Sequence, residues 1–237
     1  MEQGQFTGIS PIILALALVL FTIILFFLRR VLKSGKKCVL LTGLNETGKT
    51  LIYSQLLHNM HVSTYTSSQE NIEEYKIDGK GVTVIDLPGY HSIRQQFFEK
   101  YKNQSKAIVY VIDSVTVSQN IRDAANVLYN ILIDPAVMKN RPDLLILCNK
   151  QDQTLAKGSG VIKSMLEKEL NTLRNTQTNQ LTQLESKEKA AKLGDSSNDF
   201  SFNDLYCRVE FAESHAFNKN GSVDLEPLKK WIRKAAC

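Results

Sequence analysis

The eight residues GLNETGKT, at positions 43–50, constrain the fold of this chain more than any other stretch of its sequence. They match the pattern G-x-x-x-x-G-K-[ST], whose glycines permit backbone conformations that turn successive N–H groups toward phosphate oxygens. The pattern requires a buried strand before it and a helix after it. The apolar run CVLLT (38–42) and the segment TLIYSQLL (50–57) suit these two roles. The sequence therefore predicts an α/β fold with a phosphate-binding loop (P-loop), and these flanks argue against a chance match.

Each part of the loop has an expected role. The backbone surrounds the phosphates, the Lys49 ammonium reaches the β- and γ-phosphates, and the Thr50 hydroxyl binds Mg²⁺. The expected phosphate-binding residues are Gly43, Leu44, Asn45, Glu46, Thr47, Gly48, Lys49, Thr50 and, from a later segment, Gly89.

A second motif, CNKQD at 148–152, ends the apolar run LLILCN and resembles the N-K-x-D guanine motif of small GTPases. The Asp152 carboxylate can accept from both N1–H and the 2-amino group of guanine, whereas adenine presents an acceptor at N1 and has no 2-amino group. A buried carboxylate left unpaired costs on the order of 1–3 kcal/mol or more. We expect Asn149 to tie this loop to the P-loop and the base edge, and the stem of Lys150 to cover the ring. The expected cofactors are GTP and Mg²⁺.

A third motif lies between the first two, in VTVIDLPGYHSIRQQF at 82–97. It resembles the D-x-x-G switch of GTPases, in which Asp86 would hold Mg²⁺ through water and the Gly89 N–H would donate to the γ-phosphate. Taken alone, Pro88-Gly89 is equally consistent with an ordinary turn. As the third motif in the correct order, it favours the switch interpretation.

Two further segments complete the expected site. In VSTYTSSQE (62–70) we expect Thr66 to ligate magnesium and sense the γ-phosphate, with Ser67 and Thr64 as alternatives. FAESHAF (211–217) resembles the E-x-S-A-K loop, so the Ala216 N–H is expected to contact guanine. His215 takes the serine position of that motif, and we expect it to be a loop residue and not a catalyst.

Residues 9–28 contain no charged residue, and a basic cluster follows them at Arg29, Arg30, Lys33, Lys36 and Lys37. Roughly 20 helical residues cross the ~30 Å hydrocarbon layer of a membrane. The positive-inside rule places the N-terminus in the lumen or outside, and the remainder of the chain in the cytosol. A cleaved signal peptide, with ALA (15–17) at its cleavage site, and a buried core helix are the alternatives.

The charge distribution separates these two parts of the chain. Residues 1–37 contain five Lys or Arg and one Glu, so +4 of the net charge of +5 lies there and +1 remains for the other 200 residues. The larger part therefore has no net basic surface for sequence-specific nucleic-acid binding, and the basic cluster suits a membrane surface. The four cysteines, at 38, 148, 207 and 237, form no C-x-x-C pair and fit a reducing cytosol.

The remaining segments alternate between strand and helix patterns. We expect a strand at 107–113, helices at 117–132 and 162–174, a strand in LYCRVEFAE and a closing helix in DLEPLKKWIRKAA. This alternation predicts a mostly parallel sheet with helices on both faces. The expected organisation is a short N-terminus (1–8), a transmembrane helix (9–28), a basic linker (29–36) and a GTPase domain (37–237) with a polar, partly disordered insertion at 175–200.

The chain resembles the beta subunits of the signal recognition particle receptor. The resemblance rests on an N-terminal anchor followed by a GTPase domain, on DLPG followed by SIRQQF, on CNKQD, and on LEKELNTLR before the polar insertion. The core motifs are shared with Arf-like proteins. The resemblance implies a single-pass protein of the endoplasmic reticulum membrane with a lumenal N-terminus, which holds the receptor alpha subunit in its GTP form. It also implies indirect contact with the signal recognition particle, the ribosome and the translocon.

That family carries a histidine after D-x-P-G, where Ras-like enzymes use glutamine to orient water. This sequence has Tyr90 there and His91 one position later, so these two are the catalytic candidates and we expect slow hydrolysis. γ-Phosphate contacts alone can order switch loops, so a receptor role does not require fast hydrolysis. A rapidly cycling Arf-like trafficking enzyme and a non-hydrolysing GTP-bound scaffold are the alternative functions.

Overall fold

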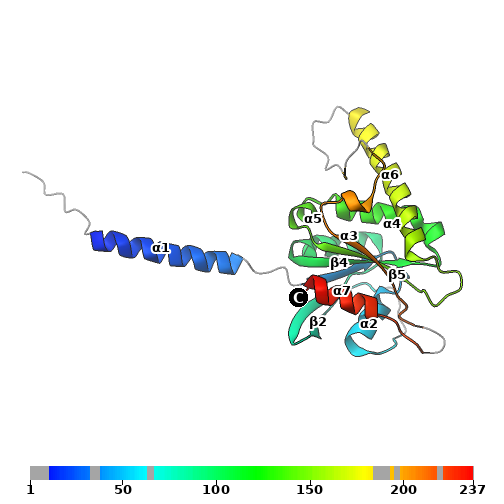
Figure 1. The fold of residues 1–237 in the computed structure, drawn as a ribbon, viewed down its shortest axis with the longest axis horizontal. Coiled ribbons are helices and arrows are strands. Elements are labelled where there is room, and N and C mark those ends of the chain that lie inside the picture. Colours follow the sequence, from blue (N-terminus) through cyan, green and yellow to red (C-terminus); the bar gives the residue numbers. More distant parts are fainter. Residues whose placement is uncertain are drawn as a thin grey trace, which may run out of the picture. The chain divides into compact units, whose positions relative to one another are not determined.

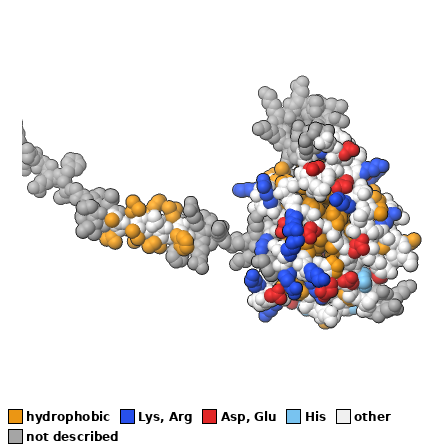
Figure 2. Space-filling view, in the orientation of Figure 1, with side chains coloured by type: hydrophobic (Ala, Val, Ile, Leu, Met, Phe, Trp, Pro, Cys, Tyr) orange, Lys and Arg blue, Asp and Glu red, His pale blue; other side chains and the backbone are white. Residues whose placement is uncertain are grey.

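The computed structural model describes residues 11–32, 38–62, 67–183, 193–194, 198–217 and 221–236 (Figure 1). The chain divides into two units, residues 1–35 and residues 36–237. The first unit contains α1 (Pro11–Leu32), whose described side chains are exposed and largely hydrophobic (Figure 2). Across the described ranges, no helix is both long enough and apolar enough to cross a membrane. The predicted span at 9–28 begins outside those ranges.

The second unit is built on one six-stranded sheet, with strand order β2-β3-β1-β4-β5-β6. β1 lies inside the sheet, where it pairs in parallel with β3 and β4, and only β2 runs antiparallel to its neighbour. This confirms the predicted mostly parallel sheet. The strands are β1 (Cys38–Gly43), β2 (Asn71–Ile77), β3 (Lys80–Asp86), β4 (Ser105–Asp113), β5 (Asp143–Asn149) and β6 (Val209–Glu213).

Helices cover both faces of the sheet, as the alternating pattern predicts. Leu40 and Tyr110 face a core closed by α3 (His91–Tyr101), α4 (Val117–Leu132), α5 (Pro135–Asn140) and α6 (Ser159–Gln183). Leu41 and Val109 face the opposite core, closed by α2 (Lys49–His58) and α7 (Glu226–Ala236). Two short 3-10 helices, Lys102–Gln104 and Phe202–Asp204, complete the unit. β1, β4 and β5 therefore consist of nearly continuous buried and mostly hydrophobic residues, because helices cover both faces of these strands.

The segment expected to be a polar insertion differs from the prediction in its first part. α6 continues to Gln183, nine residues beyond the predicted end at 174. Leu193, Phe200 and Phe202, which follow, are buried in the core beside α6. The Arg174 guanidinium donates to the Asn198 carbonyl at 2.5 Å. The C-terminal part of the segment is therefore packed against the domain, whereas its first residues, 175 and 176, are exposed. Residues 184–192 and 195–197 lie outside the described ranges.

The topology sets the position of the three motifs. The carboxyl ends of parallel strands meet at one edge of a sheet, where α/β proteins bind ligands. β1 ends at Gly43, β3 at Asp86 and β5 at Asn149, so the first residue or residues of each motif stand at this edge.

Candidate nucleotide-binding site

The two glycines of the loop after β1 adopt conformations that other residues would strain. Gly43 has φ 148° and Gly48 has φ 87°. A Cβ on Gly43 would lie 2.3 Å from the Val111 carbonyl oxygen, and one on Gly48 would lie 2.6 Å from Asn149 Nδ2. Gly48 is also the N-cap of α2 and supplies no side-chain cap, so the first amides of this helix are available to an anion.

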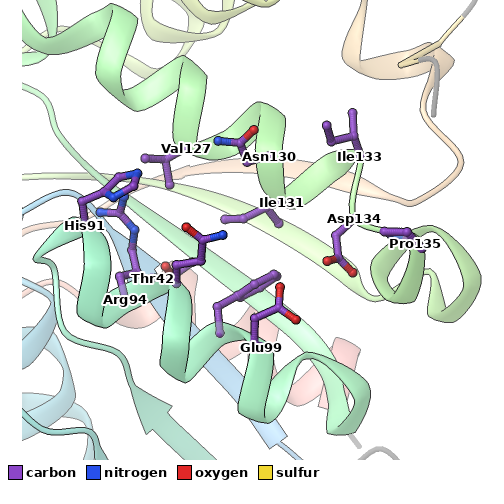
Figure 3. A pocket seen from close by; sticks show the side chains of 12 residues that line it. Thr42, His91, Arg94, Glu99, Val127, Asn130, Ile131, Ile133, Asp134 and Pro135 are labelled. Carbon is purple, nitrogen blue, oxygen red and sulfur yellow. The ribbon is translucent and has the colours of Figure 1, made fainter. Parts of the chain in front are cut away.

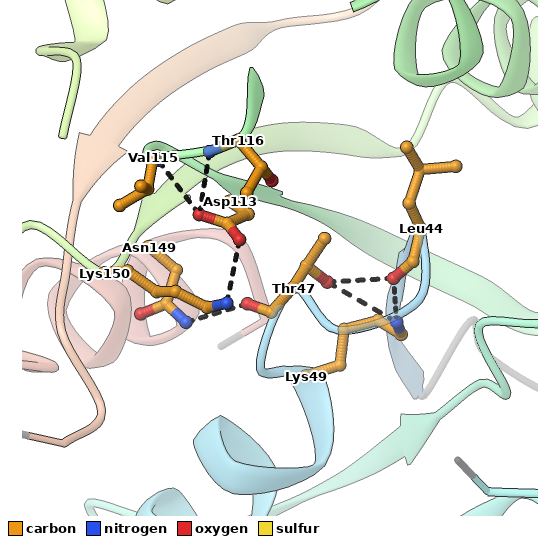
Figure 4. A network of polar contacts seen from close by, with 8 residues as sticks. All are labelled: Leu44, Thr47, Lys49, Asp113, Val115, Thr116, Asn149 and Lys150. Atoms are coloured by element: carbon orange, nitrogen blue, oxygen red, sulfur yellow. Dashed lines mark hydrogen bonds and ion pairs between the residues drawn. The ribbon is translucent and has the colours of Figure 1, made fainter. Parts of the chain in front are cut away.

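Lys49 is 6 % exposed and lies over this loop. Its Nζ donates to the Leu44 carbonyl at 2.6 Å, and the Thr47 hydroxyl donates to the same oxygen at 3.1 Å (Figure 4). Burial lowers the pKa of Lys49 to about 8, with Asp86 opposing that shift and Arg94 adding to it. The ammonium is thus held close to the loop, where a phosphate oxygen could replace a neutral carbonyl as its partner.

Asp86, at the end of β3, is 1 % exposed. Its Oδ2 accepts from the Thr50 hydroxyl at 2.7 Å and from Asn71 Nδ2 at 3.2 Å, whereas Oδ1 has no hydrogen-bond partner among the described residues. Burial raises the pKa of this carboxyl, against the lowering effect of Thr50 and Lys49. A buried, unpartnered carboxylate oxygen beside a threonine hydroxyl fits a magnesium ion or one of its waters.

The other expected magnesium ligand, Thr66, lies outside the described residues. Ser67, one of the alternatives, has its hydroxyl 3.5 Å from the Thr50 hydroxyl. The described ranges contain no group of three or more His, Cys, Asp or Glu side chains placed to hold a metal. Thr50, Asp86 and the nucleotide phosphates would therefore supply the ligands, with Ser67 close to them.

A pocket of about 410 Å³ lies over the loop and is lined by Asn45, Lys49, Thr50, Gly89 and residues beside them. Gly89 packs directly on Asn45, because a Cβ on Gly89 would stand 2.3 Å from Asn45 Oδ1. The structure thus brings the first and third motifs into contact, as their predicted common role in phosphate binding requires.

The two catalytic candidates do not line this pocket. Tyr90 precedes α3 as its N-cap and is 55 % exposed. His91 lines a second pocket of about 350 Å³ between α3 and α4, together with Thr42 and Arg94 (Figure 3).

The loop after β5 is bonded to the P-loop. Asn149 is 2 % exposed, donates through Nδ2 to the Thr47 carbonyl at 2.9 Å and accepts through Oδ1 from the Ser214 hydroxyl at 3.3 Å. Lys150 has φ 67°, and its Nζ lies 2.8 Å from Asp113 Oδ2 (Figure 4). Burial acts to raise the pKa of Asp113, but the bonds from Lys150 and the Val115 amide outweigh it and lower that pKa.

Asp152 and Ala216 line a smaller pocket of about 150 Å³ beside Asn149. This pocket shares Gly48, Leu51 and Lys150 with the phosphate pocket, so the two are adjacent.

His215, just before Ala216, closes its loop through two backbone hydrogen bonds with Asp224. This fits the expected loop role of His215.

Sequence reasoning missed several residues of the site. Asp113 is the last residue of β4, just as Asp86 is the last residue of β3. A search for acidic residues at strand ends would therefore have found Asp113. Ser214 lies within the predicted guanine loop FAESHAF (211–217), and its role appears through its hydrogen bond to Asn149. Asn71 and Arg94 reach the site only through the tertiary fold, and no local pattern marks them.

The chain is a P-loop protein with the small-GTPase fold. Its mostly parallel sheet has helices on both faces and a P-loop after β1. The D-x-x-G segment packs against the P-loop, and the N-K-x-D loop is hydrogen-bonded to the P-loop. The chain matches the family model of the signal recognition particle receptor beta subunit over residues 34–209. It belongs to this family.

Individual relatives agree with the family match. The chain is 40 % identical to the human signal recognition particle receptor subunit beta over 243 residues, covering 100 % of this chain and 89 % of the relative. It resembles the structure of the mammalian signal recognition particle receptor with a TM-score of 0.75 at 39 % identity, covering 84 % of this chain and 100 % of that one. It also shares the fold of the SRb-GTP/SRX complex from Chaetomium thermophilum, with a TM-score of 0.63 at 21 % identity, covering 84 % and 97 %.

Proposed function

We propose that this chain is a guanine-nucleotide-binding receptor subunit that binds GTP with Mg²⁺ and holds the receptor alpha subunit at the endoplasmic reticulum membrane. The observation that carries the proposal is the adjacency of the two pockets, joined by the Asn149–Thr47 hydrogen bond. One pocket offers Lys49 and Thr50 to phosphates, and the other offers the Asp152 carboxylate to a base with two adjacent donors.

In the proposed complex, the P-loop residues 43–50 and the Gly89 amide surround the phosphates. Thr50, Asp86 and a hydroxyl of the 64–67 segment hold magnesium, which neutralises phosphate charge. Asp152 and the Ala216 amide recognise guanine. Bound γ-phosphate sets the conformation of the segments 62–70 and 87–98, in which residues 91–98 already belong to α3. These segments form the docking face for the alpha subunit.

Family membership supports the alpha-subunit partner. Indirect contact with the signal recognition particle, the ribosome and the translocon through that partner belongs to the proposal.

Residues 9–28 are proposed as the membrane anchor, with the N-terminus in the lumen and residues 37–237 in the cytosol. The support is the uncharged sequence of this segment and the basic cluster that follows it. The helix α1, whose described side chains are exposed and largely hydrophobic, is consistent with it.

Hydrolysis is proposed to be slow, at or below the ~10⁻⁴–10⁻³ s⁻¹ of an unassisted small GTPase. The exposure of Tyr90 and the separate pocket of His91 support this, because neither replaces a water-orienting glutamine. Slow hydrolysis favours a receptor subunit or a GTP-bound scaffold over a rapidly cycling trafficking enzyme.

The test is a pull-down with residues 36–237, loaded with a non-hydrolysable GTP analogue or with GDP and presented to the alpha subunit. A ligand shifts a conformational equilibrium only by its differential affinity for the two states, so the GTP-analogue form should recover more partner. Lys49→Ala should reduce recovery, whereas Lys168→Ala, on the exposed side of α6, should not. Equal recovery in both nucleotide states would reject the switch and leave a plain membrane anchor.

A further inference from the structure

Arg94, in the first turn of α3, connects the two loops that meet at the phosphate pocket. Its Nη1 donates to the Gly89 carbonyl at 2.8 Å and to the Gly43 carbonyl at 3.4 Å. Gly43 begins the P-loop and Gly89 ends the D-x-x-G segment. One buried guanidinium group, 6 % exposed, therefore links the two backbones.

The Arg94 charge is not neutralised by a neighbouring acid. Among the described residues, no Asp or Glu oxygen lies within ion-pair distance of it. Burial lowers its pKa, yet an arginine stays protonated in a protein. A buried cation without an anion is costly, and a nearby anionic ligand would relieve that cost.

The field of Arg94 reaches the phosphate site. Its positive charge is one of the causes that lower the pKa of Lys49. Arg94 itself lines the pocket between α3 and α4, beside Thr42 and His91, and is absent from the lining of the phosphate pocket (Figure 3). Any effect of Arg94 on a bound phosphate would therefore pass through Gly89 and through its charge, and not through direct contact.

We propose that Arg94 is the positioning residue that sets the preference for the triphosphate over the diphosphate, by holding Gly89 in register with the P-loop so that its N–H meets the γ-phosphate. The proposal rests on the proposed binding of guanine nucleotides. β-Phosphate contacts come from the P-loop and Lys49, so the loss of Arg94 should weaken GTP binding more than GDP binding.

The test compares the affinities of Arg94→Met and Arg94→Lys in residues 36–237 for GDP and for a non-hydrolysable GTP analogue. Arg94→Met should lower the GTP-analogue-to-GDP affinity ratio roughly tenfold, which corresponds to the loss of about one charge-assisted hydrogen bond. Arg94→Lys keeps the charge and one donor, so it should restore part of the ratio. Arg174→Met is the matched control, because Arg174 is 5 % exposed and lies on α6. It should lower the thermal midpoint and leave the ratio unchanged.

An equal loss of affinity for both nucleotides in Arg94→Met would show a purely structural arginine and overturn the proposal. If Arg94→Met does not fold, Arg94→Lys decides alone, and an unaltered ratio in that variant overturns it. Failure of the unmodified protein to bind either guanine nucleotide would instead reject the proposed function. Binding with an unaltered ratio rejects only the role of Arg94.

Discussion

The two ends of the candidate nucleotide site are built differently. At the guanine end, the Asn149 amide bridges the Thr47 carbonyl and the Ser214 hydroxyl, and Lys150 is paired with Asp113. At the γ-phosphate end, the hydrogen bonds are made by the side chains proposed to hold phosphate and magnesium. Thr50 donates to Asp86, and Lys49 donates to the loop carbonyl of Leu44. The hydrogen bonds at the guanine end can persist when a nucleotide binds. Those at the γ-phosphate end would be replaced by bonds to phosphate and metal.

This difference matches what a nucleotide-state sensor must distinguish. The base is the same in GDP and GTP, so its pocket can be fixed by the fold. The third phosphate is the variable part, so its contacts must be remade in each state. Rigid scaffolding at one end and exchangeable bonds at the other allow specificity and switching within one site.

The largest expected effect tests the fixed end. Asp152→Asn should weaken GTP binding about 30-fold, corresponding to roughly 2 kcal/mol for a mispaired polar group. Xanthosine triphosphate, whose C2 carbonyl can accept from the new amide, should bind better to the variant than to the unmodified chain. Competition titrations with both nucleotides measure the two changes. Asp204→Asn, at an exposed site, serves as control, and unchanged GTP binding in Asp152→Asn would remove the guanine assignment.

A pH titration tests the exchangeable end, with a smaller effect. The pKa of Lys49 is about 8 without ligand, and phosphate should raise it toward its ordinary value of 10.5. Nucleotide affinity is then full below about 8 and is lost as pH rises through that value, by roughly tenfold between about pH 7 and about pH 9. Lys49→Met should bind nucleotide weakly at every pH. Its affinity should keep only the pH dependence that comes from ionisation of the guanine ring. Parallel slopes in the two proteins would contradict the role of Lys49.

The smallest expected effect concerns Tyr90, which lies at the edge of the exchangeable end. Tyr90→Gln should raise single-turnover hydrolysis or leave it unchanged, because the native side chain is exposed and outside the phosphate pocket. Nucleotide affinity should change by about twofold or less, as for most exposed substitutions. A fall in the hydrolysis rate would identify Tyr90 as catalytic. A rate of about 1 s⁻¹ in the unmodified domain without partner, far above unassisted turnover, would show that Tyr90 or His91 is catalytic.

Sequence reasoning was most successful where chemistry is encoded locally. The glycines at 43 and 48 adopt the positive φ values that the motif requires, and α4 spans the predicted residues 117–132. It was less successful where distant segments decide the outcome. The buried side chains of Phe200 and Phe202 beside α6 could not be inferred from the polar segment before them. Arg94 falls in a helix of ordinary composition, and only the tertiary fold brings it to Gly43, 51 positions earlier in the chain.

The hydrogen bond between Asn149 and Thr47 joins residues 102 positions apart in the chain. Domains generally fold as units, and synthesis proceeds at about 5–20 residues per second. The hydrogen bond to Thr47 can therefore form only after β5 has docked, and the pocket wall at Ala216 can form only after β6 has docked. An emerging chain would carry the complete phosphate motif long before it could retain a nucleotide. Nucleotide loading would then mark the completion of biosynthesis, and fragments truncated before residue 216 would lack it.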